Sequence, residues 1–142
     1  MARRKGRILA FQALYAWDVS HLSLPDLLDF SWVEQDKLLK LGDDGVAFPR
    51  LIIAGTLEHI AEIDERIKAH LTNWDFDRLS KVDLAILRIS VYSLMYQSDI
   101  HPTIVIDEAI DISKEFGADE SFKFINAVLD NIRKNLQGNS VQ

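Results

Sequence analysis

The segment from Lys81 to Tyr96 constrains the fold more than any other part of the chain. Eleven of its sixteen residues are apolar, and at helical spacing they occupy every side of the segment instead of one stripe. A helix that is apolar all round must be surrounded by other elements, so the segment predicts a buried helix at the centre of a bundle. Ser80 and Asp83 form a capping box, with Asp in place of Glu, at its start.

Helical periods extend along nearly all the rest of the chain. Helices are predicted from about Arg4 to Val19, from Leu24 or Pro25 onward, from Phe48 to Leu71, from Pro102 or Thr103 to Gly117, and from Phe122 to Leu136, with Gly138 ending the last one. Pro49 favours the start of its helix over the interior. Residues 34–45 are polar and end in Gly-Asp-Asp-Gly, which predicts a loop. Because no alternating strand pattern of useful length occurs, the sequence predicts an all-α fold.

A length of 142 residues predicts one domain, residues 1–142. The chain has no cysteine, which excludes disulfides and thiolate metal sites and is compatible with the cytoplasm, where we expect the protein. No stretch approaches the roughly 20 continuous apolar residues of a membrane span. The N-terminus is basic and then apolar, but it lacks the cleavage site of a signal peptide, so we interpret it as mature structure.

The positive charge at the N-terminus points to a ligand. Within residues 1–20, only Asp18 opposes Arg3, Arg4, Lys5 and Arg7, so this segment sums to +3, whereas the whole chain carries −6 and residues 21–142 therefore −9. A cationic segment on an anionic body marks a place where a polyanion could dock. Arginine can grip phosphate bidentately. A solvated basic terminus without a ligand explains the same residues, so the run alone leaves nucleic-acid binding open.

The sequence contains no motif for catalysis or for a cofactor. A nucleophile elbow, a phosphate-binding glycine loop and a dinucleotide fingerprint are all absent. Asp107, Glu108 and Asp111 could in principle hold a metal, but the Glu-x-x-His pair of di-metal bundles is missing, which favours a solvated helix face. We therefore expect a protein that is not an enzyme and needs neither metal nor cofactor.

A resemblance to a known family rests on three blocks of residues in the same order. They are Ala2–Arg7 with Gln12–Trp17, then Val82–Leu94, then Ile106–Ser121 with Lys123–Asp130. Together they resemble the NusB family of bacterial transcription antitermination factors over nearly all of the chain. The resemblance implies about seven helices in two packed small bundles. It also implies binding of box A-type single-stranded RNA together with NusE, the small-subunit ribosomal protein, in the RNA polymerase antitermination complex during rRNA transcription.

The resemblance also implies which residues bind. Arg3, Arg4, Lys5 and Arg7 fall on the arginine-rich RNA-binding motif of the family. The other residues that it places at the RNA surface are Gln12, Tyr15, Lys123, Phe124 and Asn126. Asp77 and Asp83 match acidic positions near the junction between the RNA and NusE. Gly6 stands where the family often has a better helix former, so we expect a less ordered start of the first helix.

Two other functions fit the same sequence. One is a NusB-like docking domain of the kind that precedes some rRNA methyltransferases, and the other is a purely protein-binding helical module with an incidental basic terminus. Some family members pair through their RNA-binding face, which adds a homodimer to the expected states. Titration of box A-like RNA with and without NusE separates these alternatives.

Overall fold

The structure is a computed structural model that describes the backbone of residues 2–30, 32–71 and 75–141, without the side chains of residues 2, 3, 37, 38, 41–44 and 138–141. Over these ranges the chain forms seven α-helices, one 3-10 helix and no strand, which confirms the all-α prediction. The elements are α1 (Ala2–Ser20), α2 (Leu24–Asp29), α3 (Gln35–Glu58), α4 (Ile60–Ala69), η1 (Phe76–Arg78), α5 (Lys81–Tyr96), α6 (Pro102–Phe116) and α7 (Ser121–Val141).

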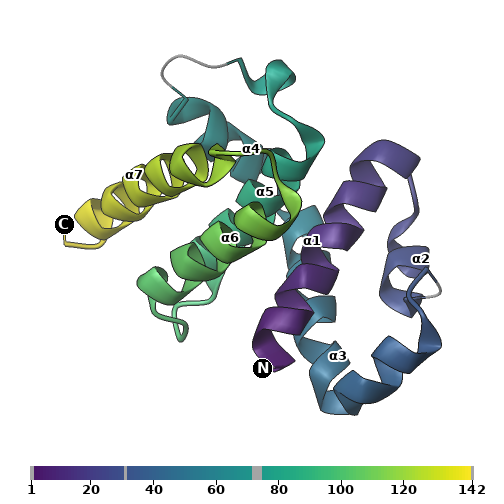
Figure 1. Ribbon diagram of the computed structural model, residues 1–142. Helices are drawn as coiled ribbons and strands as arrows, with labels where there is room; N and C mark the ends of the chain where they lie inside the picture. The colour runs from purple at the N-terminus through teal and green to yellow at the C-terminus, as the bar shows by residue number, and fades with distance from the viewer. Residues whose placement is uncertain (1, 31, 72–74, 142) are drawn as a thin grey trace.

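The helices form two groups that share one central helix. Figure 1 shows α1, α2 and α3 together on one side and α4, α6 and α7 on the other. Helix α5 packs against α1 and α3 of the first group and against α4, α6 and α7 of the second. Every residue of α5 from Asp83 to Ser93 is buried, as its all-round apolar pattern predicts. The two small bundles implied by the family resemblance are therefore present.

Two of the predicted signals at helix ends are found in the structure, at Ser80 and at Gly117. The Ser80 hydroxyl accepts a hydrogen bond from the backbone N–H of Asp83 at 3.0 Å, which is the first half of a capping box. Gly117 ends α6, and its N–H donates to the carbonyl of Ser113 at 2.8 Å. A Cβ atom on Gly117 would lie only 2.8 Å from that same carbonyl oxygen, so the position requires glycine.

Helix α3 contradicts two predictions. Residues 35–45 belong to the helix, so the predicted loop over 34–45 is wrong, and Pro49 lies inside the helix and not at its start. A glycine costs a helix only about 1 kcal/mol, which tertiary packing can outweigh. The buried Pro49 ring lies against α1, where a Cβ atom on Gly6 would come within 3.2 Å of it. Close packing against Gly6 of α1 thus accounts for the position of Pro49 inside α3.

The predicted helix from Phe48 to Leu71 is in fact two helices. His59 ends α3 and precedes α4, with a backbone φ of −110° and ψ of 22°. The apolar stripe gives no signal of this break, because its five steps from Ile53 to Leu71 average 3.6 residues, the period of a straight helix. Ile63 and Ile67 on α4 are buried, as the stripe predicts.

The two ends of the chain also differ from the predictions. Helix α1 begins at Ala2 and includes Gly6, which is buried beside the side chain of Phe48. Helix α7 continues through Gly138 to Val141. Among the helices that the structure describes, none is both long and apolar enough to cross a bilayer.

Candidate nucleic-acid interface

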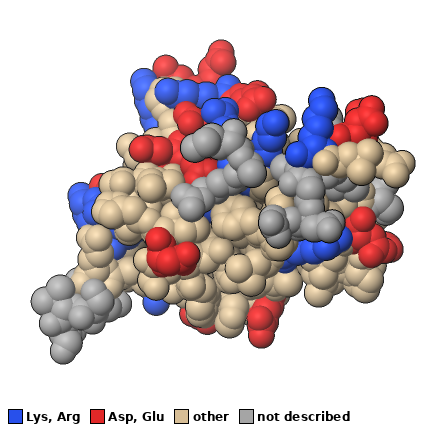
Figure 2. All heavy atoms as spheres, turned by 90° about the horizontal axis from the view of Figure 1, so that it is seen from below, with Lys and Arg blue, Asp and Glu red and all other residues tan. Residues whose placement is uncertain are grey.

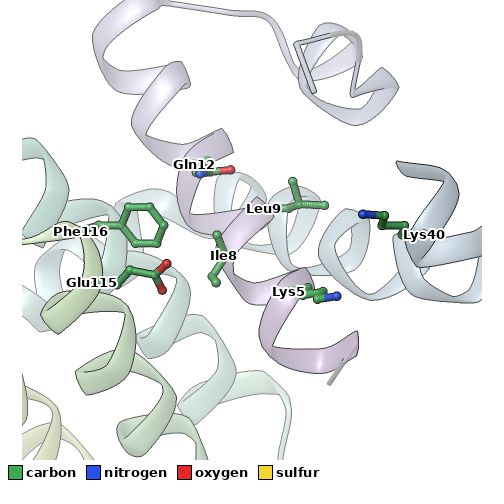
Figure 3. Close-up of a pocket in the computed structure, with 7 residues that line it drawn as sticks. All are labelled: Lys5, Ile8, Leu9, Gln12, Lys40, Glu115 and Phe116. Atoms are coloured by element: carbon green, nitrogen blue, oxygen red, sulfur yellow. The ribbon is translucent and has the colours of Figure 1, made fainter. Parts of the chain in front are cut away.

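One face of α1 forms the floor of an open groove. Figure 3 shows this helix between the end of α6, which supplies one wall, and α3, which supplies the other. The groove has a volume of about 500 Å³. Its lining residues are Lys5, Ile8, Leu9 and Gln12 on the floor, and Lys40, Glu115 and Phe116 on the walls. We call it the α1 groove. Tyr15 lies one turn beyond Gln12 and is 39% exposed.

The side chains of the predicted basic run lie on different sides of α1. Arg7 is fully buried, because it begins the inner stripe that continues with Ala10, Phe11 and Leu14. Its Nη1 donates a hydrogen bond of 2.9 Å to the hydroxyl of Ser93 on α5. This guanidinium is therefore enclosed by the protein in this conformation and does not present itself to a phosphate.

The other cations of the run lie in different settings. Arg4 is half-exposed and approaches Asp111 at 3.8 Å and Glu115 at 3.4 Å, so α6 already neutralises part of its charge. Lys5 is exposed and lines the α1 groove. The side chain of Arg3 lies outside the described residues. Figure 2 shows one face of the molecule, on which blue basic and red acidic side chains lie interspersed.

A second hollow brings together residues from the start of α7 and the start of α5. Its volume is about 370 Å³, and its lining residues are Arg78, Leu79, Ser80, Asp83, Asp119, Glu120, Ser121 and Phe124. We call it the α7 hollow. It contains two of the predicted residues, Asp83 and Phe124. Asp77 is exposed in η1, and Asn126 is exposed on α7.

Lys123 stands beside the α7 hollow with a local partner. Its side chain is 63% exposed and lies 3.0 Å from the carboxylate of Glu120, three residues earlier. Glu120 itself has a left-handed backbone, with a φ of 71°. An exposed pair of this kind is worth at most about 1 kcal/mol, so the ammonium group can readily exchange the carboxylate for a phosphate.

Asp83 has a setting unlike that of a surface carboxylate. It is only 9% exposed. Burial raises the pKa of the Asp83 carboxyl, and hydrogen bonds with Ser121 and Ser80 act in the opposite direction. Asp83 lines the α7 hollow beside Ser80 and Ser121, at the starts of α5 and α7, whereas Asp77 is the more accessible of the two predicted partner-binding residues.

The two hollows are neighbours, since one short segment borders both. Phe116 at the end of α6 forms a wall of the α1 groove, and Asp119, Glu120 and Ser121 line the α7 hollow. The predicted residues of α1 and of α7, which are more than a hundred positions apart in sequence, therefore flank the same α6–α7 connection.

Sequence reasoning missed two residues of this surface. The sequence does not place Lys40 beside α1, because residues 34–45 predict a loop without defined neighbours. The helical spacing of Phe116 from Val105, Ala109 and Ile112 predicts an inward side chain, but Phe116 is 37% exposed while those three residues are buried. Its position directly before Gly117, where the helix ends, is the signal that could have identified it.

The acidic face of α6 shows no metal site. Over the described residues, no group of three or more histidine, aspartate or glutamate side chains is arranged to hold an ion.

Comparison with known proteins gives one consistent result. The NusB family model matches residues 4–134 of the chain. A transcription antitermination protein NusB from Treponema denticola is 56% identical over 133 residues, which cover 94% of this chain and 96% of that protein.

Solved structures agree with the sequence comparison. NusB of T. maritima superposes with a TM-score of 0.82 at 33% identity, covering 93% of this chain and 90% of that one. A structure described as antitermination factors NusB and NusE in complex with dsRNA matches with a TM-score of 0.83 at 30% identity, over 94% of this chain and 97% of that one. The groove, the hollow and the helices that build them thus belong to a fold shared along almost the whole chain, and the protein is a member of the NusB family.

Proposed function

We propose that this protein is a transcription antitermination factor that binds box A-type single-stranded RNA together with NusE and supports rRNA transcription. The observation that carries the proposal is the family match over residues 4–134. In this proposal the protein acts as one RNA-binding domain over residues 1–142, in the cytoplasm, without enzymatic activity. It works as a component of the RNA polymerase antitermination complex, and a homodimer through the same face would compete with RNA.

The side chains suggest how the RNA would be held. Lys5 and Lys123 would contact phosphates, because both ammonium groups are exposed. Tyr15 and Phe124 offer aromatic surface on which unpaired bases can stack.

Amide and cationic groups complete the proposed site. Gln12 and Asn126 offer amide donors and acceptors for base edges. Arg4 adds positive charge beside the groove, and we include Arg3, the preceding residue of α1, in the proposed RNA-binding site. Arg7 contributes by fixing the helix and not by touching the RNA.

The acidic residues fit a protein partner better than RNA. Asp77 in η1 is exposed and has no reason to approach a phosphate chain, because like charges repel. We assign Asp77, with Asp83 behind it, to the side of the interface that faces NusE.

A salt titration tests this proposal. Each phosphate contact with single-stranded RNA contributes about −0.7 to the slope of log K against log salt concentration. Changing both Lys5 and Lys123 to Ala should therefore weaken binding of box A RNA and reduce the magnitude of the slope by about 1.4. The measurement is fluorescence anisotropy with labelled RNA at several salt concentrations, with and without NusE.

The matched control is Lys134→Ala. Lys134 lies on the same helix as Lys123, is 64% exposed and pairs with Asp130 at 3.1 Å, but it lies outside the α7 hollow. The Lys134→Ala substitution should leave both the affinity for box A RNA and the slope against salt concentration unchanged. An identical slope for the double variant and the wild type would remove Lys5 and Lys123 from the RNA surface. A wild-type protein that does not bind box A RNA even with NusE would refute the function itself.

A further inference from the structure

One wall of the α1 groove is formed by Lys40, which is not among the predicted RNA-binding residues. Lys40 reaches it from α3, opposite the wall formed by α6, and Figure 3 shows its amino group directed toward α1 near Leu9. Lys5 lies on the floor of the same groove. Two lysines thus border one hollow from two helices, which is an arrangement suited to a chain of negative charges.

The carboxylate in the groove does not cancel this charge. Among the described residues that line it, Glu115 is the only acidic one, and its Oε2 lies 3.4 Å from Nη2 of Arg4. A carboxylate that already faces a guanidinium repels an incoming phosphate less than an isolated one would. The described residues that line the groove therefore carry two positive charges against one negative charge, on a protein whose net charge is −6.

The opposite wall is aromatic. The ring of Phe116 packs on one side against Phe11, with centroids 5.3 Å apart and the planes tilted by 46°, yet the residue remains 37% exposed. An aromatic ring that is held from behind and open in front is a stacking platform. Gln12 beside it carries both a donor and an acceptor for a base edge.

We propose that the α1 groove holds one unpaired nucleotide of the bound RNA, with its base stacked on Phe116 and its flanking phosphates contacted by Lys5 and Lys40. The groove volume of about 500 Å³ lies within the range of small-molecule sites. A base can reach the ring only when it is unstacked from its neighbours, so the occupant is a single-stranded nucleotide and not a base pair. This inference rests on the proposed function and adds a subsite to it.

Substitutions of Phe116 and of Lys40 should change RNA binding in different ways. Phe116→Leu keeps an apolar side chain against Phe11 but removes the stacking surface, so RNA affinity should fall about fivefold or more at every salt concentration, with the slope unchanged. Phe116→Tyr should restore the affinity. Lys40→Ala should instead reduce the magnitude of the salt slope by about 0.7. The probe is labelled single-stranded box A-type RNA, and the fold is checked by the thermal midpoint of each variant.

The outcomes distinguish this subsite from the wider proposal. Wild-type affinity for Phe116→Leu, or a wild-type slope for Lys40→Ala, overturns the subsite, and the Lys5 and Lys123 variants then decide the proposed function separately. If the two groove variants lose NusE binding but keep RNA binding in the absence of NusE, the groove takes a protein segment and the inference is wrong. Lys134→Ala again serves as the neutral control.

Discussion

Replacing Arg88 by alanine should destabilise the protein by about 3–5 kcal/mol, because it leaves the mostly buried carboxylate of Asp64 without its cation and Asp18 with Lys81 alone. Arg88 is 6% exposed. Its Nε and Nη2 donate to the two oxygens of Asp64, both at 2.9 Å, and its Nη1 donates to Asp18 at 3.3 Å. The guanidinium therefore joins α5 to α4 and to the end of α1 in a single contact.

Chemical denaturation measures this effect. The control is Arg78→Ala, since Arg78 is 82% exposed and lies 3.9 Å from Asp75, a surface pair worth at most about 1 kcal/mol. A loss below about 1 kcal/mol for Arg88→Ala would mean that water replaces the guanidinium and that the contact does not hold the three helices together.

Replacing Leu87 by alanine should cost about 2–5 kcal/mol of unfolding free energy, because it opens a cavity in the centre of α5. Leu87 is fully buried, in the helix that both bundles share. The loss should be seen in the denaturant midpoint without a change in the slope of the transition.

A leucine at the surface provides the comparison. Leu39 on α3 is 72% exposed, so Leu39→Ala should change stability by no more than about 0.5 kcal/mol. Equal effects of the two substitutions would show that α5 is not the core of the fold.

The parts of the fold that could be predicted from sequence are those in which local pattern and tertiary packing agree. Helix α5 is apolar on all sides and is buried on all sides. Its capping box and the Gly117 terminus depend on neighbours a few residues away, so short-range rules suffice for them. Helix α3 was mispredicted because glycine and proline are local signals, whereas its contact with α1 is decided by residues forty positions away.

The residues of the candidate site also fall into those that the sequence could indicate and those that it could not. A run of cations is visible in any sequence, but whether each one faces water depends on its angle around the helix. Arg7 shares the inner side of α1 with Ala10, Phe11 and Leu14, and this spacing could have revealed its burial. Lys40 could not have been found, because its place beside α1 depends on a helix that the sequence did not predict.

The anchoring of Arg7 has a consequence for the entropy of RNA binding. Its hydrogen bond to Ser93 continues to Gln97, to which the Ser93 hydroxyl donates at 2.6 Å, so the first turns of α1 are tied to the end of α5. Ordering the backbone of a loose basic tail costs about 1–2 kcal/mol per residue, or roughly 5–10 kcal/mol over five residues. Here folding has already removed that freedom, so an RNA strand meets these turns in a helical shape. Its rate of association should then depend on diffusion and charge, and not on the time that a tail needs to fold.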